Sequence, residues 1–213
     1  MIKSNVINKI KFMGQKVSAS IVQAASAQRF LRLNDLRARG MSPQMAVHLA
    51  RQGVLTRVGP GVYSLPDAPL TEHQSLAEAA QMAPRAVVCL LSALQFHGIG
   101  TQQPHQVWLA LPKGVQLPRS LAGRARPVWV SGEAFAAGVE THDDAGAGIR
   151  VYGVAKTLAD CFKFRNKVGL DVALEALREA WAARRFSMDD LAHHARINRV
   201  ERVMQPYLEA LTA

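Results

Sequence analysis

A serine followed by a proline, Ser42-Pro43, constrains the fold more than any other feature of this 213-residue sequence. Serine is a favourable helix N-cap, and proline suits the first helical position because no N–H is needed there. The pair therefore predicts a helix over 43–52, and Gly53 is placed to end it.

A shorter helix is predicted over 35–39, with Asn34 as its N-cap and Gly40 as its terminator. Two β-prone runs, VLTRV and VYSL, follow the second helix and are joined by a Gly-Pro-Gly turn at 59–61. The glycines permit the backbone angles of a tight hairpin. Helix, turn, helix and hairpin in this order are typical of a winged helix-turn-helix.

Charge is concentrated in the same part of the chain. Up to Leu65 there are ten Lys and Arg residues and one acid, Asp35, which gives +9 of the formal net charge of +10. Such a segment gains free energy by neutralising phosphates and releasing their counterions, so nucleic acid is the expected partner. DNA is favoured over RNA, because Phe30 and Tyr63 fit core positions rather than a base-stacking surface. An anionic lipid surface is the least favoured partner, since the basic residues do not line one long amphipathic helix.

A stiff, polar stretch at 66–69 coincides with the change in charge and predicts a domain boundary. We expect an α+β fold, with a basic arm and winged helix-turn-helix over 1–66 and a mixed α/β domain over 67–213 that ends in several helices. For the second domain we predict helices over 71–82, 91–97, 155–164, 169–185, 188–197 and 201–212, and strands over 86–89, 107–111, 127–131, 139–142 and 149–152.

Several other classes of protein are disfavoured by the sequence. The apolar run at 86–94 is interrupted by Ser92 and too short to cross a bilayer, and the first residues lack the apolar core of a signal peptide. With only Cys89 and Cys161, neither a disulfide framework nor a zinc finger is expected. We therefore expect a cytoplasmic protein without a cofactor.

Three segments at and beyond the hairpin carry a family resemblance: QGVLTRVGPGVYSLPDAPLTEHQSLAEAA, VVCLLSALQFHGIGTQQPHQVWLALP and KTLADCFKFRNKVGLDVALEALREA. They resemble the AbiEi-type antitoxin family, from about Arg32 to near the C-terminus, and the N-terminal arm lies outside the similarity. The resemblance implies a transcriptional autorepressor that binds operator DNA and serves as antitoxin in a type IV system of abortive infection and phage defence. It implies a nucleotidyltransferase-like toxin as counterpart, with no direct binding required.

The candidate DNA-binding residues follow from how winged helices dock. The second helix enters the major groove, and its predicted outward face carries Gln44, Val47, His48 and Arg51. Phosphate contacts that position the protein are expected from basic residues of the arm, first helix and wing: Lys9, Lys11, Lys16, Arg29, Arg32, Arg37 and Arg57. Family members commonly carry a basic residue in the wing where this chain has Pro60. A solvated helix face in a domain that contacts a protein is the alternative interpretation.

No catalytic or metal-binding residue is assigned. His142, Asp143 and Asp144 lie together, and His193-His194 form a pair, but neither group has a second ligand at metal spacing. A nucleotidyltransferase pattern, a nuclease pattern and a phosphate loop are all missing from the sequence.

Two further interpretations remain open. The first is a nucleic-acid-processing enzyme with a metal site in the C-terminal domain, built from His142, Asp143 and His97, although His97 is expected to be structural. The second is a repressor unlinked to any toxin. A cationic patch over 156–167 is interpreted as structural capping, with anion binding as its alternative.

Overall fold

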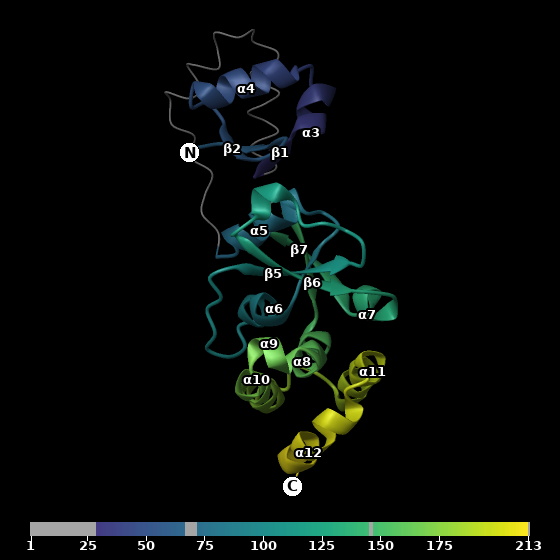
Figure 1. The fold of residues 1–213 in the computed structure, drawn as a ribbon. Coiled ribbons are helices and arrows are strands. Elements are labelled where there is room, and N and C mark those ends of the chain that lie inside the picture. Colours follow the sequence, from purple (N-terminus) through teal and green to yellow (C-terminus); the bar gives the residue numbers. More distant parts are fainter. Residues whose placement is uncertain (1–28, 67–71, 145–146, 213) are drawn as a thin grey trace. The chain divides into compact units, whose positions relative to one another are not determined.

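The computed structural model of the chain describes residues 29–66, 72–144 and 147–212 (Figure 1). It divides into two compact units. Unit 1 comprises the residues up to Met82 together with Asp143–Gly148, and unit 2 comprises Ala83–His142 and Ile149–Ala213. The predicted domain boundary between residues 66 and 67 stays a prediction.

Unit 1 contains the two helices and the hairpin of a winged helix-turn-helix. Its sheet is antiparallel, with strand order β1-β3-β2. Along the chain the elements are β1 (Phe30–Arg32), α3 (Leu33–Ala38), α4 (Pro43–Arg51), β2 (Thr56–Gly59), β3 (Val62–Ser64) and α5 (Gln74–Met82). The predicted order of helix, turn, helix and hairpin is confirmed, and unit 2 supplies the mixed α/β part of the predicted fold class.

Helix α4 starts where the Ser42-Pro43 pair predicts. The Ser42 side-chain oxygen accepts a hydrogen bond from the Met45 backbone N–H at 3.1 Å, and Pro43 occupies the first helical turn. Helix α3 begins two residues earlier than expected, because β1 runs directly into it and Arg32 is the N-cap. The predicted capping role of Asn34 is therefore wrong.

In the core of unit 1, the inner faces of α3 and α4 pack against the three-stranded sheet. Leu36 and Ala46 are fully buried, and Leu49 and Tyr63 are each 2% exposed. Phe30 is also buried, at 5% exposed, so the predicted core positions of the two aromatic residues are confirmed. The cluster consists of Leu31, Leu36, Met41, Ala46, Leu49, Val54, Leu55, Tyr63 and Leu65. This packing fixes which face of α4 points outward.

Unit 2 is built on a five-stranded sheet of order β6-β5-β4-β8-β7. Strand β4 pairs antiparallel with β5 and parallel with β8, and β5 pairs parallel with β6. Its elements are β4 (Val87–Val88), α6 (Leu90–Phe96), β5 (Val107–Pro112), the short helix η1 (Arg119–Leu121), β6 (Ala125–Val130), α7 (Glu133–Ala136), β7 (Val139–Asp144), β8 (Ala147–Tyr152), α8 (Val154–Lys163), α9 (Arg165–Val168), α10 (Leu170–Ala182), α11 (Met188–Asn198) and α12 (Glu201–Thr212).

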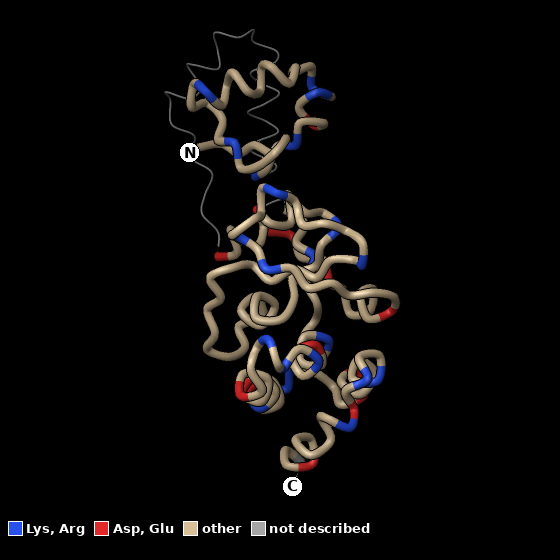
Figure 2. The backbone as a smooth tube through the Cα atoms, viewed as in Figure 1, with Lys and Arg blue, Asp and Glu red and all other residues tan. Residues whose placement is uncertain are grey.

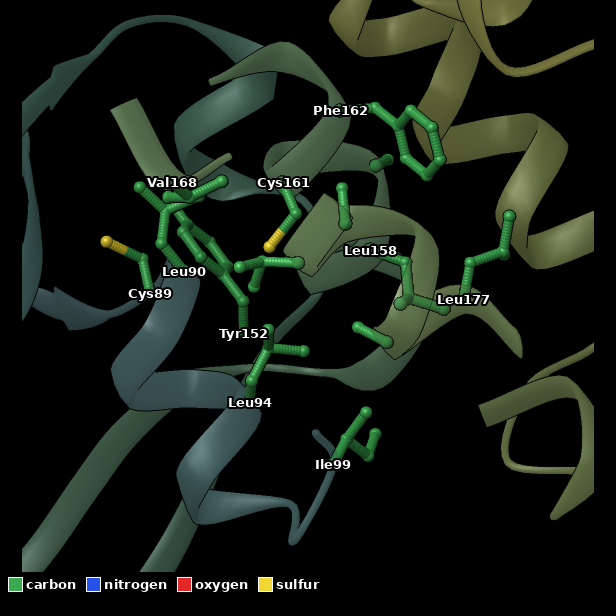
Figure 3. Packing of buried hydrophobic residues seen from close by; sticks show 14 of the residues in the cluster. Cys89, Leu90, Leu94, Ile99, Tyr152, Leu158, Cys161, Phe162, Val168 and Leu177 are labelled. Atoms are coloured by element: carbon green, nitrogen blue, oxygen red, sulfur yellow. The ribbon is translucent and has the colours of Figure 1, made fainter. Parts of the chain in front are cut away.

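Helix α8 lies at the centre of this unit and packs against α6, α10 and α11. Figure 3 shows Tyr152, Leu158 and Cys161 among the side chains of the core cluster around it. Its buried residues run without interruption from Lys156 to Phe162, so two charged residues, Lys156 and Asp160, lie inside the core. Within the described ranges, no helix has both the length and the apolar character needed to span a bilayer.

Candidate nucleic-acid interface

The outward face of α4 carries the four residues predicted to face the major groove. Gln44, Val47, His48 and Arg51 are all exposed, and their spacing along the helix places them on one face. The Gln52 side-chain amide donates to His48 Nε2 at 2.9 Å, so the imidazole is held by a neighbour on the same helix. Val47, with 36% of its surface exposed, adds an apolar group to this polar face.

Further exposed arginines lie on the neighbouring elements of unit 1. Figure 2 shows where Lys and Arg occur along the backbone of these elements. Arg37 is exposed near the end of α3. Arg57 is exposed on β2, with its Nε donating to the Gly59 carbonyl at 3.4 Å. Arg32 is exposed at the end of β1, and its Nε donates to Gln81 Oε1 at 2.9 Å. Asp35 is the single acid of residues 29–66, so the field around α4 is positive.

Of the other predicted phosphate contacts, one is buried and three belong to the part of the chain that the structure does not describe. Arg29 is buried, at 8% exposed, with its guanidinium carbon 5.6 Å from the centre of the Phe30 ring. Lys9, Lys11 and Lys16 lie outside the described residues. The basic surface described here therefore rests on the arginines of α3, α4, β1 and β2.

Arg39 is a basic residue of this region that was not singled out in the sequence. It is exposed just after α3, and its Nη1 donates to the Asp35 carbonyl at 3.0 Å. In the sequence, the only indication that Arg39 belongs to a basic surface was its contribution to the positive charge of this segment. At the tip of the wing Pro60 is exposed and carries no charge, so the positive side chain nearest the tip in sequence is Arg57.

Helix-turn-helix, wing and exposed second helix together define unit 1 as a winged helix-turn-helix. Residues 20–66 match the family described as "Transcriptional regulator, AbiEi antitoxin". The match confirms the predicted family resemblance for the segment that contains this motif. The match begins at residue 20, whereas the resemblance seen in the sequence begins at about Arg32.

A solved structure extends the similarity of fold beyond unit 1. The crystal structure of the RV2827C protein from Mycobacterium tuberculosis aligns with a TM-score of 0.59 and 17% sequence identity, covering 84% of this chain and 70% of that chain. At this identity the likeness concerns the fold. The comparison with curated proteins found no match.

Three histidines to which the sequence assigned no catalytic or metal-binding role lie around one cavity in unit 2. His97, His142 and His194 all line it, although they come from the end of α6, from β7 and from α11. His97 Nε2 donates to the Tyr152 carbonyl at 2.8 Å, as expected of a structural histidine. Asp143 does not line the cavity. In the part of the chain that the structure describes, no group of three His, Cys, Asp or Glu side chains is arranged to hold a metal ion.

The cationic patch predicted over 156–167 is not a continuous surface. Lys156 is fully buried and forms an ion pair with Asp160, four residues along the same helix. Asn198 on α11 donates to the same Asp160 oxygen at 2.7 Å. Lys163 donates to the Asn198 carbonyl at 2.9 Å and Arg165 to the Phe162 carbonyl at 3.0 Å, so the predicted capping role is confirmed for these two residues.

We expect unit 2 to lose stability as the pH falls from about 7 to about 5, through the ordinary titration range of histidine. Burial lowers the pKa of both His97 and His194. The unfolded chain therefore binds protons at pH values where the folded chain does not, and the free energy of unfolding decreases. Urea unfolding followed by tryptophan fluorescence measures this, because Trp108, Trp129 and Trp181 all belong to unit 2.

The double variant His97→Gln, His194→Gln is the control for this pH dependence. Glutamine retains hydrogen-bonding groups but does not titrate, so the difference in stability between the two pH values should be smaller in the double variant. An unchanged difference would show that other groups cause the pH dependence.

Proposed function

We propose that the chain is a DNA-binding transcriptional autorepressor and the antitoxin of a type IV, AbiE-like toxin-antitoxin system in phage defence. Its winged helix-turn-helix, within residues 1–66, binds operator DNA of its own operon, and residues 67–213 carry the antitoxin activity. The functional counterpart is a nucleotidyltransferase-like toxin, and direct binding to it is not required. The protein acts in the cytoplasm without a cofactor, and no catalytic role is assigned.

One observation carries the DNA-binding part of this proposal: four exposed side chains share one face of α4, and the neighbouring elements of unit 1 carry exposed arginines. In duplex DNA, the face of α4 lies in the major groove, where Gln44 and Arg51 meet donors and acceptors of base edges. Val47 contacts a thymine methyl group, and His48 contributes a hydrogen bond from the same face. Arg32, Arg37 and Arg57 contact phosphates and set the position of the helix.

The antitoxin part is supported by the description of the family that matches residues 20–66. Expression of the neighbouring toxin gene with and without this chain tests it directly. Rescue of growth by the full chain supports the antitoxin role. Sequence-specific repression without rescue would leave a repressor unlinked to a toxin.

We expect Arg51→Ala to lower the affinity for operator DNA by about 1–3 kcal/mol, because a contact to a base edge is lost. Fluorescence anisotropy of the full chain on its upstream DNA and on a scrambled duplex, across a salt series, measures the loss and its dependence on sequence. Arg37→Ala should instead weaken binding to both duplexes equally and reduce the salt dependence.

Arg178→Ala is the matched control, since Arg178 is an exposed arginine of α10 in unit 2. It removes the same charge away from the proposed surface and should leave both affinities nearly unchanged. If Arg51→Ala and Arg178→Ala reduce binding equally on both duplexes, the charge acts without specificity and α4 does not read the operator.

A further inference from the structure

A cavity of about 490 Å³ lies in unit 2 at the start of α8, which is enough volume for a small metabolite. Lys156, with no exposed surface, contributes to its wall, and exposed Glu140, His142 and Arg185 contribute from the solvent side. The Lys156 ammonium nitrogen also lies 4.3 Å from the centre of the Tyr152 ring. The cavity is therefore polar and combines side chains from separate elements of one unit.

Both carboxylates that line the cavity already have partners. Glu140 Oε2 pairs with His142 Nε2 at 2.9 Å, and Asp190 Oδ2 accepts a hydrogen bond from Ser187 Oγ at 2.6 Å. A cationic ligand would have to compete with these internal partners. The acidic groups thus do not define the ligand.

Two positive or hydrogen-bonding groups of the cavity wall, in contrast, have no partner among the described residues. The Arg185 side chain forms no hydrogen bond or ion pair with any residue that the structure describes. Nδ1 of His194 is buried and has no hydrogen-bond partner among those residues. Helix α8 begins here after Gly153 without a side-chain cap, so its first N–H groups and the positive end of its dipole lie at the cavity wall.

We propose that this cavity binds a small molecule that carries an oxyanion, either a carboxylate or a phosphate. The oxyanion contacts Arg185 and the N–H groups at the start of α8, where donors and positive charge favour an anion. Phosphates and carboxylates share this chemistry, and the cavity volume limits the rest of the ligand to a small metabolite.

The position of Glu140 supports this choice of ligand. Its Oε1 lies so close to Gly153 that a Cβ atom at Gly153 would collide with it. A carboxylate of the protein itself thus already approaches this helix end. The ligand oxyanion competes with the Glu140 carboxylate for this place and displaces it. Loss of the Glu140 charge should therefore strengthen binding, whereas loss of the Arg185 charge should weaken it.

Titration of the full chain with inorganic phosphate, succinate and ribose 5-phosphate in phosphate-free buffer tests the proposal. Binding is followed by the histidine ring signals in NMR spectra, because three of the seven histidines line the cavity. We expect the signals of His97, His142 and His194 to shift, with those of His73 and His105 unchanged. The difference between succinate and the two phosphates shows which oxyanion the cavity takes.

Three variants decide whether these shifts report the proposed site. Arg185→Ala should weaken binding by at least about fivefold, the loss expected for one charge-assisted contact, and Glu140→Gln should strengthen it. Arg178→Ala, an exposed arginine outside the cavity, should change nothing. The proposal is overturned if none of the probes shifts the three histidines at about 10 mM, or if Arg185→Ala and Arg178→Ala have equal effects. Neither result bears on DNA binding by α4, which is measured separately.

Discussion

Replacement of Asp160 by alanine is expected to lower the free energy of unfolding of unit 2 by about 3–5 kcal/mol. The substitution leaves the Lys156 ammonium group, which has no exposed surface, without its ion-pair partner inside the core. It also removes the acceptor of the hydrogen bond from Asn198. An unpaired buried charge is among the most destabilising defects in a protein core. Urea unfolding followed by tryptophan fluorescence measures the change.

A surface pair provides the control for this substitution. Arg196 and Glu201 lie 3.5 Å apart with side chains 70% and 53% exposed, so Glu201→Ala should cost less than about 1 kcal/mol. The double variant Lys156→Met, Asp160→Leu should lose less stability than the sum of the losses in the single variants Lys156→Met and Asp160→Leu. In the double variant no unpaired charge remains in the core. A loss in Asp160→Ala no greater than that in Glu201→Ala would contradict a structural role for the buried pair.

Leu49→Ala is expected to destabilise unit 1 by about 2–5 kcal/mol, the usual cost of truncating a buried leucine. Leu49 is 2% exposed on the inner face of α4 and belongs to the small core under the helix-turn-helix. Hydrogen exchange measured by mass spectrometry should show loss of protection in α3, α4, β2 and β3. Affinity for operator DNA should fall with it, since the exposed face of α4 depends on this packing.

Val47→Ala on the opposite face of α4 separates stability from recognition. Val47 is 36% exposed, so its truncation should leave hydrogen exchange unchanged. It should still reduce affinity for operator DNA, because the contact to a thymine methyl group is lost. Loss of protection in Val47→Ala comparable to that in Leu49→Ala would mean that the two faces were assigned wrongly.

The elements that the sequence predicted correctly are those defined by local signals. Ser42 and Pro43 mark the start of α4, and Gly53, with a backbone φ of +70°, follows its end. Strand β1 escaped prediction because its three residues, Phe30–Arg32, form a strand only by pairing with β3, about thirty residues later. The predicted helix over 169–185 is α10, over Leu170–Ala182, preceded by the separate turn of α9.

The α4 face and the cavity of unit 2 also differ in how far local sequence signals predict them. The face of α4 could be predicted because four residues at helical spacing are enough to define it. The cavity of unit 2 could not be predicted, since long-range packing brings together Glu140, Lys156, Arg185 and His194. They come from strand β7, helices α8 and α11, and the connection between α10 and α11. Lys156 was misplaced on a surface patch for a related reason: its partner Asp160 is one turn away, but only the tertiary packing shows that both are buried.

The chain's two cysteines, Cys89 and Cys161, are both free and buried in the core of unit 2, at 2% and 0% exposed. Burial raises the pKa of both thiols, so a reagent that attacks the thiolate must wait until the core opens. The rate of thiol modification in native buffer therefore measures the opening of unit 2. No engineered probe is needed, and the winged helix-turn-helix, which has no cysteine, contributes nothing to the signal.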